Sequence, residues 1–81
     1  MKEGYAMATE YREQFIRFGL KVQYYRKLSG MTQEAFAEKI GKSWSFLAKI
    51  ESPTRPFGVS METLFKIADV LNIPVSKLFE D

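Results

Sequence analysis

The most constraining feature of this sequence is a pair of short helix-forming stretches separated by a single glycine. Thr32 and Ser43 are good N-cap residues, because their hydroxyl oxygens can accept a backbone N–H from the first helical turn. They precede residues 33–40 and 44–51, which we expect to be helical. Gly41 lies between the two stretches and can adopt the positive φ that a tight turn requires. The sequence therefore predicts two short helices that meet at a sharp angle.

Helical patterns also account for the rest of the chain, and none of it shows the alternation that indicates a strand. We expect further helices at residues 9–28, 61–71 and 75–79, with a rigid loop at 52–59. Residues that cap or break helices mark these boundaries: Thr9, Ser29, Gly30, Pro53, Pro56, Ser60 and Asn72. The predicted fold is all-α, a compact five-helix bundle with an extended first helix. We expect residues 9–81 to form one domain, preceded by a disordered segment at 1–8.

Apolar residues recur three or four positions apart in these stretches, which indicates the face that each helix turns to the core. The predicted core-facing positions are Phe15, Phe18, Val22, Tyr25, Phe36, Ile40, Leu47, Ile50, Leu64, Ile67, Ala68, Leu71, Leu78 and Phe79. Burial of Leu47 and Ile50 would leave positions 45, 48 and 49 exposed on the third helix.

Composition narrows the classes of function. The 81 residues include no cysteine and no histidine, so a disulfide framework is excluded and a structural zinc site is not expected. The commonest general base is missing, and no carboxylate or lysine lies in a catalytic motif, so we expect neither an enzyme nor a cofactor. No apolar run resembles a secretory signal or a membrane span. These features favour a cytoplasmic protein that binds no metal and no membrane.

Charge is distributed unevenly along the chain, although the net charge is only +2. Residues 21–60 carry seven basic and three acidic side chains, whereas residues 61–81 carry two basic and four acidic ones. The net charge is therefore +4 for residues 21–60 and −2 for residues 61–81. This distribution suggests that one side of the protein faces a polyanion. Ordinary solvated charge is the alternative explanation, and charge alone does not exclude it.

The segment from Phe18 to Phe79 resembles the helix-turn-helix domain of the lambdoid phage repressor and Cro family, whose bacterial members are often called the xenobiotic-response-element family. The resemblance rests on residues in the right order and spacing: Tyr25-Arg26-Lys27, Gly30-Met31-Thr32-Gln33-Glu34, Ala37, Ile40-Gly41, Ser43, Lys49-Ile50-Glu51, Thr63-Leu64, Lys66-Ile67-Ala68, Leu71 and Leu78-Phe79. It implies a sequence-specific transcriptional regulator, and a repressor in particular, that binds double-stranded DNA.

The resemblance also implies a role for individual side chains. Base contacts are expected from the exposed face of the third helix, at Trp44, Ser45 and Lys49. A solvated helix face is the alternative for Ser45 and Lys49, whereas the Trp44 indole could instead fold back on the core. Phosphate contacts are expected from Thr32, Gln33, Lys42, Ser43, Phe46 and Arg55. Simple exposure is the alternative for Gln33, and partial burial is the alternative for Phe46.

Arg26 and Glu51 are expected to be structural. Members of the family pair an arginine of the first helix with the glutamate that ends the third, and a bidentate pair would fix the recognition helix on the first helix. Three features depart from the family pattern. Lys42 stands where a small aliphatic residue is usual, and Trp44 stands where a polar residue is usual. The loop after Glu51 is longer than the common form, with Pro53 where glycine is frequent.

One recognition helix reads only a few base pairs, so we expect a homodimer on a palindromic operator. Two surfaces could form the dimer. One is a C-terminal apolar cluster of Ile73, Val75 and Phe79, and the other is an aromatic N-terminal segment with Tyr5, Tyr11 and Phe15. We favour the C-terminal cluster. The alternative function is a protein-interaction module, such as an antitoxin, whose main partner is another protein.

Overall fold

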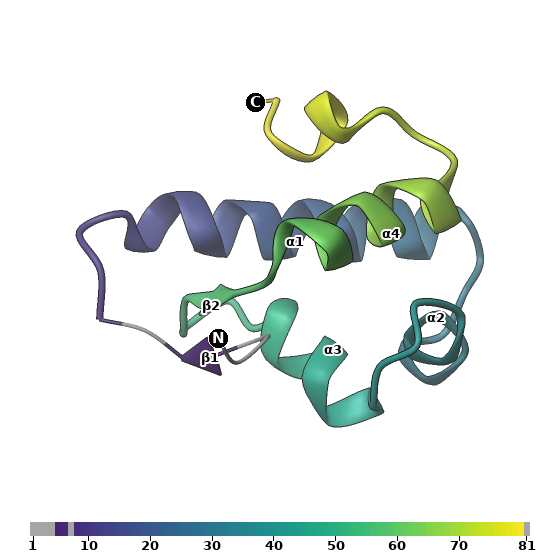
Figure 1. Ribbon diagram of the computed structural model, residues 1–81, viewed down its shortest axis with the longest axis horizontal. Coiled ribbons are helices and arrows are strands. Elements are labelled where there is room, and N and C mark those ends of the chain that lie inside the picture. The colour runs from purple at the N-terminus through teal and green to yellow at the C-terminus, as the bar shows by residue number, and fades with distance from the viewer. Residues whose placement is uncertain (1–4, 7, 81) are drawn as a thin grey trace.

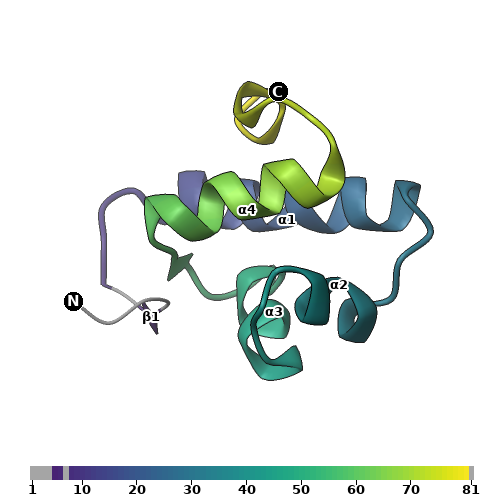
Figure 2. The same cartoon turned by 45° about the vertical axis from the view of Figure 1, so that its right-hand side comes forward.

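The computed structural model describes residues 5–6 and 8–80. This part of the chain holds four α-helices, one 3-10 helix and two short strands: β1 (Tyr5–Ala6), α1 (Arg12–Leu28), α2 (Gln33–Lys39), α3 (Trp44–Ile50), β2 (Phe57–Gly58), α4 (Met61–Leu71) and the 3-10 helix η1 (Val75–Leu78). α1 and α4 lie side by side in a middle layer (Figure 1). The pair α2 and α3 lies on one side of that layer and η1 on the other, as Figure 2 also shows.

The predicted starts of α2, α3 and α4 are confirmed. The hydroxyl oxygens of Thr32, Ser43 and Ser60 each accept the backbone N–H three residues further along, at 3.0–3.1 Å. Each helix begins at the next residue. The side-chain caps replace hydrogen bonds that the first turn of a helix cannot make internally. They therefore fix where each helix begins.

The predicted left-handed residues also end their helices. Gly30, Gly41 and Asn72 have φ of 77°, 73° and 57° and follow α1, α2 and α4. The backbone N–H of each of these residues, and that of the residue after it, donates to a carbonyl in the last turn of the preceding helix. This pattern satisfies carbonyls that would otherwise be left without partners. The sharp turn between α2 and α3 follows from it.

The first helix begins later than predicted. Thr9 does not cap it, because its Oγ1 accepts the N–H of Tyr11 at 3.0 Å and so closes a turn ahead of the helix. Tyr11 is the N-cap residue and makes no side-chain cap hydrogen bond. Residues with hydroxyl side chains form such local turns as readily as caps. The helix therefore starts at Arg12 and not near Thr9.

The expectation of no strands is wrong. β1 and β2 pair in antiparallel register, Tyr5 opposite Gly58 and Ala6 opposite Phe57. β1 lies in the segment 1–8 that we expected to be disordered, and β2 lies in the predicted loop 52–59. Residues 1–4 and 7 lie outside the described part of the chain. Strands of two residues are too short to show an alternating pattern, so they could not be predicted from the sequence.

The fifth predicted helix, at residues 75–79, is present not as an α-helix but as a 3-10 helix of four residues. Pro74 precedes it, and so short a segment closes i→i+3 hydrogen bonds more easily than an α-helical ladder. Leu78 is buried as predicted, but Phe79 is 59% exposed. The Phe79 ring stacks on Phe18 with centroids 5.5 Å apart, so it covers the core from outside and does not fill it.

Most of the other predicted core positions are buried, with Phe15, Tyr25 and Leu64 half-buried at the edge. A contact that the sequence analysis missed brings α1 and α3 together. Gly19 of α1 is buried against the carbonyl of Ile50, and a Cβ at this position would lie 1.8 Å from that oxygen. Only glycine allows this approach of the two backbones. The end of α3 is thereby seated on the middle of α1.

Candidate DNA interface

The exposed face of α3 carries all three residues predicted to contact bases. Leu47 and Ile50 are buried, at 0% and 2% exposure. Ser45 and Lys49 are exposed, as the helical period requires, and Trp44 is exposed at the N-terminal end of the helix. With α2, this helix forms one side of the molecule (Figure 1, Figure 2). The face is therefore open to a large partner such as a DNA groove.

A buried ion pair holds the end of α3 on α1. Arg26 Nε donates to Glu51 Oε2 at 2.7 Å, and Arg26 Nη2 donates to Glu51 Oε1 at 2.9 Å. Arg26 Nη1 also donates to the carbonyl of Met31 at 2.7 Å. Both charged residues are more than nine-tenths buried. This is the bidentate pair that the resemblance implies, and its geometry fixes orientation as well as distance.

Gln33 extends this pair to the start of α3. Its amide nitrogen donates to Glu51 Oε1 at 3.0 Å, and its amide oxygen accepts the indole N–H of Trp44 at 2.9 Å. The Trp44 ring is 58% exposed and so does not fold back on the core. Gln33 was predicted from the sequence to be a phosphate contact or an exposed glutamine, and neither bond was foreseen. No local pattern could have shown them, because Gln33 begins α2 whereas Trp44 begins α3 and Glu51 is its C-cap residue.

The residues predicted to contact phosphates lie around this face with different accessibility. Thr32 and Ser43 are exposed, and their hydroxyls, although they accept cap hydrogen bonds, each keep an O–H to donate. Arg55 is exposed in the loop after α3, whereas Lys42 is half-buried with its ammonium 5.3 Å from the centre of the Phe46 ring. Phe46 is itself half-buried, which was the alternative left open for it.

The Phe46 ring also anchors the longer loop that follows α3. It meets Phe57 edge to face, with centroids 5.5 Å apart. The guanidinium of Arg12 donates to the carbonyl of Thr54, which ties the same loop to the start of α1. Pro56, Phe57 and Gly58 are buried. The loop that departs from the family pattern is thus packed onto the domain beside α3.

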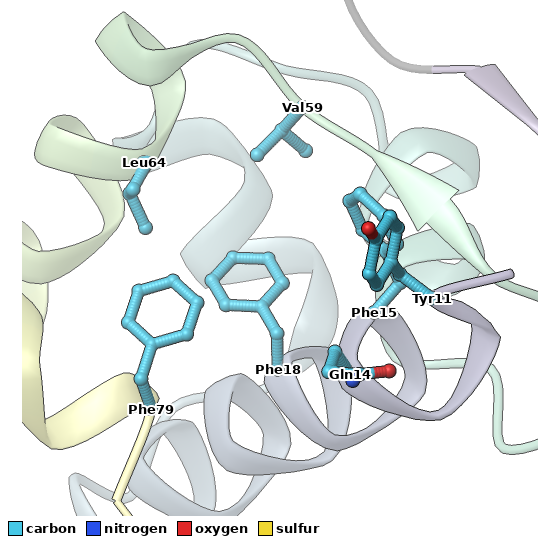
Figure 3. A pocket seen from close by; sticks show the side chains of 7 residues that line it. All are labelled: Tyr11, Gln14, Phe15, Phe18, Val59, Leu64 and Phe79. Atoms are coloured by element: carbon cyan, nitrogen blue, oxygen red, sulfur yellow. The ribbon is translucent and has the colours of Figure 1, made fainter. Parts of the chain in front are cut away.

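A second surface of interest is an apolar hollow of about 340 Å³ on the side of α1 and α4. It is lined by Tyr11, Gln14, Phe15, Phe18, Val59, Leu64 and Phe79. In Figure 3 the rings of Phe18 and Phe79 lie together, with Tyr11 and Phe15 across from them. Residues from both predicted dimer surfaces therefore meet in one hollow. The side chain of Tyr5 lies outside the described part of the structure, and Ile73 and Val75 are half-buried elsewhere.

The described residues contain neither a metal-binding cluster nor a membrane-spanning helix. No three of their acidic side chains gather closely enough to hold a metal ion. None of their helices has the length and apolar character needed to cross a membrane.

The fold and the exposed α3 define a helix-turn-helix protein, and comparison with known sequences identifies the family. The helix-turn-helix family profile matches residues 22–78. An HTH-type transcriptional regulator of Bacillus subtilis, YazB, is 41% identical over 61 residues, which cover 75% of this chain and 86% of YazB. The chain belongs to the Cro/C1-type, or xenobiotic-response-element, helix-turn-helix family.

Another relative is longer than this chain. An HTH-type transcriptional regulator of Sinorhizobium medicae is 36% identical over 66 residues, which are 82% of this chain but 46% of that protein. The chain thus spans about half the length of this relative.

Solved structures agree with the family. The restriction-modification controller protein C.AhdI of Aeromonas hydrophila superposes with a TM-score of 0.74 at 28% identity, over 83% of this chain and 98% of that one. The master regulator for biofilm formation SinR, solved in complex with DNA, gives a TM-score of 0.70 at 32% identity, over 78% of this chain and 98% of that one.

Proposed function

We propose that this protein is a transcriptional regulator that binds double-stranded DNA in a sequence-specific way, with α3 in the major groove. The observation that carries the proposal is the exposed face of Trp44, Ser45 and Lys49 on a helix anchored by the buried pair of Arg26 and Glu51. A helix held this rigidly can place side chains against base edges with the accuracy that direct readout requires. Residues 9–81 form the DNA-binding domain, and the protein works as a cytoplasmic repressor.

Each side chain of the interface has a chemical role in this proposal. Ser45 and Lys49 hydrogen-bond to bases, with Lys49 directed at guanine O6 or N7. Thr32, Gln33 and Ser43 donate to phosphates and position α3 in the groove. The cations of Lys42 and Arg55 add phosphate contacts from the turn and the loop, and the edge of Phe46 lies against the sugar-phosphate backbone. The structural neighbour SinR was solved in complex with DNA, which supports DNA as the partner of this fold.

The active form in this proposal is a homodimer on a palindromic operator. A single module of this kind buries about 600–1,000 Å² on DNA, at the low end for specific recognition, and two-fold pairing doubles the base contacts. The apolar hollow is the surface that the dimer covers, because Phe79 and Tyr11 are 59% and 55% exposed there. Sedimentation of the free protein and of its complex should give a protomer pair on one duplex.

The hollow also supports the second candidate function, a module whose main partner is another protein. An exposed apolar surface with several aromatic side chains is typical of a protein-binding site. Salt dependence separates the two functions, because an interaction module should show no salt-dependent binding to DNA. The first test is therefore a mobility-shift titration on random duplex DNA at low salt, repeated at increasing salt.

A charge-matched pair of variants shows which face binds. Lys49→Ala and Lys77→Ala each remove one positive charge, but Lys49 is on α3 whereas Lys77 is on η1 and pairs with Glu80 at 3.5 Å. We expect Lys49→Ala to weaken binding and Lys77→Ala to leave it unchanged. Equal effects would mean that binding depends on net charge and not on α3. Absence of any shift at low salt would contradict the proposed function.

A further inference from the structure

The helix α1, which runs the length of the molecule (Figure 1), carries apolar side chains on two faces. Phe18 and Val22 face the core and are buried, at 5% and 0% exposure. On the outer side, Leu20, Tyr24 and Leu28 are 38%, 57% and 68% exposed. These three residues are four positions apart, so they form one row along the helix. Single exposed apolar residues are ordinary on a protein surface, but a helix that is apolar on more than one face is typically covered on each of them.

Two hollows border this row and together form one groove, which we call the α1 groove. The first has a volume of about 530 Å³ and extends to Glu80, and the second has a volume of about 430 Å³ and extends to Leu28 at the end of the helix. Leu20 and Tyr24 line both hollows, so the two are continuous. The row from Leu20 to Leu28 is about 12 Å long, which is about two helical turns. The groove therefore has the length of a short helical contact.

The charges around the α1 groove are mainly positive. Arg17, Lys21 and Lys27 line it, and Glu80 is the one acidic residue among the described residues that do so. Glu80 also pairs with Lys77 at 3.5 Å, which offsets part of its negative charge. Apolar surface thus lies between basic side chains. The complementary surface is an apolar stripe with acidic residues at its edges.

Tyr24 provides a rigid anchor in the middle of the α1 groove. Its ring meets the ring of Tyr25 edge to face, with centroids 5.0 Å apart, and Tyr25 packs against the core. Because this contact already restricts the Tyr24 ring, little conformational freedom is lost when a partner covers it. Aromatic side chains at the centre of an interface commonly contribute much of the binding energy.

We propose that the α1 groove binds an amphipathic α-helix of a partner protein, with acidic residues beside its apolar stripe. The apolar side chains of that helix pack on Leu20, Tyr24 and Leu28, and its carboxylates pair with Lys21 and Lys27. A contact of about two turns is small, so the complex is transient. The inference goes beyond the proposed function, because it requires neither α3 nor DNA. It gives the protein a second surface, through which another protein can act on it.

Two other occupants fit the α1 groove less well. In an antiparallel pair of α1 helices related by a two-fold axis at Tyr24, Leu20 of one copy meets Leu28 of the other. The same axis places Lys21 opposite Lys27, so like charges oppose a second copy. An anionic lipid surface presents negative charge to Glu80 as well as to the lysines. A helix can instead place an uncharged residue opposite Glu80, which favours a protein partner.

Fluorescence anisotropy with labelled synthetic helices tests the proposal. The probe is a peptide of about 15 residues, long enough to form a helix in part, with leucines three and four positions apart and glutamates on either side of them. One control peptide has the same composition in scrambled order, and another has lysine in place of each glutamate. We expect the protein to bind the probe about tenfold more tightly than either control, and less tightly as salt rises. Equal binding of the three peptides, or binding of none, would overturn the proposal.

Two matched pairs of variants locate the site. Tyr24→Ala and Phe65→Ala each remove an aromatic side chain that is more than half exposed, but Phe65 is on α4 and does not line the α1 groove. Lys27→Glu and Lys39→Glu each reverse an exposed charge in the last turn of a helix, and only Lys27 lines the groove. We expect Tyr24→Ala and Lys27→Glu to weaken binding of the probe about tenfold, and the other two to leave it unchanged. Equal losses within either pair would refute the site.

The same variants test the other two occupants. Binding of the wild-type protein, but not of Tyr24→Ala, to phosphatidylglycerol vesicles would assign the α1 groove to a membrane. Self-association that Tyr24→Ala abolishes in sedimentation would assign it to a second copy. Either result would contradict the proposal, whereas no difference between Tyr24→Ala and the wild type in both assays would support it. Thermal melting provides the control for folding, because all four substitutions are at exposed positions and the variants should melt close to the wild type.

Discussion

The contact between Gly19 and Ile50 gives the sharpest prediction about the fold. Gly19 lies within α1, and a Cβ there would stand 1.8 Å from the carbonyl oxygen of Ile50 and 3.0 Å from its carbonyl carbon. Both atoms belong to the backbone, so no change of side-chain rotamer can relieve the clash. We predict that Gly19→Ala destabilises the protein, although alanine is the better helix former.

The size of the effect follows from two opposing contributions. Helix propensity alone would favour alanine by about 1 kcal/mol. Insertion of a methyl group into a closely packed contact costs about 1–3 kcal/mol and occasionally more, and a clash with rigid backbone belongs at the upper end of that range. We expect a net loss of about 2 kcal/mol or more. For a domain of this size that loss lowers the melting temperature by about 8–16 °C.

Thermal and urea denaturation followed by circular dichroism measure this loss. Lys27→Ala is the matched control, because it introduces the same residue at an exposed position of the same helix and should change stability by less than about 0.5 kcal/mol. Helix propensity alone would make Gly19→Ala more stable than the wild type, whereas the backbone clash would make it less stable. The sign of the measured change in stability therefore shows which of the two dominates. A variant at least as stable as the wild type would refute the close packing of α1 on α3.

Three further predictions concern α3 and its anchor. Leu47→Ala should cost about 2–5 kcal/mol in urea denaturation, because Leu47 is fully buried, and a neutral result would mean that α3 is rotated. Glu51→Ala leaves the Arg26 guanidinium buried without its carboxylate and should cost about 3–5 kcal/mol, so a loss near zero would contradict the buried pair. Lys49→Ala should weaken specific DNA binding by about 1–3 kcal/mol and relax the preference at one base pair, whereas an equal loss on all sequences would make Lys49 a phosphate contact.

The starts of α2, α3 and α4 and the end of α4 were predictable because their determinants are local. Ser60 and Asn72 bracket α4, and the structure places its ends where the sequence did. A cap hydroxyl acts on an N–H three residues away, and a left-handed residue acts on the preceding turn. Such signals do not depend on the rest of the fold. The burial of Leu47 and Ile50 followed in the same way from the helical period.

The features that the sequence did not reveal depend on distant partners. β2 forms because Tyr5–Ala6 pairs with it across 50 residues of chain, and no property of Phe57–Gly58 alone indicates this. Gly19 looks like a weak point in a helix until α3 is placed against it. A glycine in the middle of an otherwise regular helix was the one signal that could have suggested a close backbone contact.

The candidate site also combines features that could be predicted from the sequence with one that could not. Exposure of Ser45 and Lys49 followed from periodicity, and the pairing of Arg26 with Glu51 followed from the family resemblance. The bond from Trp44 to Gln33 required the relative placement of α2 and α3, which only the structure supplies. That bond and the 58% exposure of the ring exclude the alternative in which the Trp44 indole folds back on the core.

Selection of bound duplexes from a random pool tests the central claim most directly. If α3 reads bases and the protein pairs on its operator, the selected sequences should converge on a two-fold symmetric motif with half-sites about one helical turn apart. Binding to that motif should weaken as salt rises, and the Ser45→Ala, Lys49→Ala double variant should no longer distinguish it from random DNA. A pool that converges on no sequence, or a motif that the double variant still selects, would contradict the claim that α3 confers sequence-specific recognition.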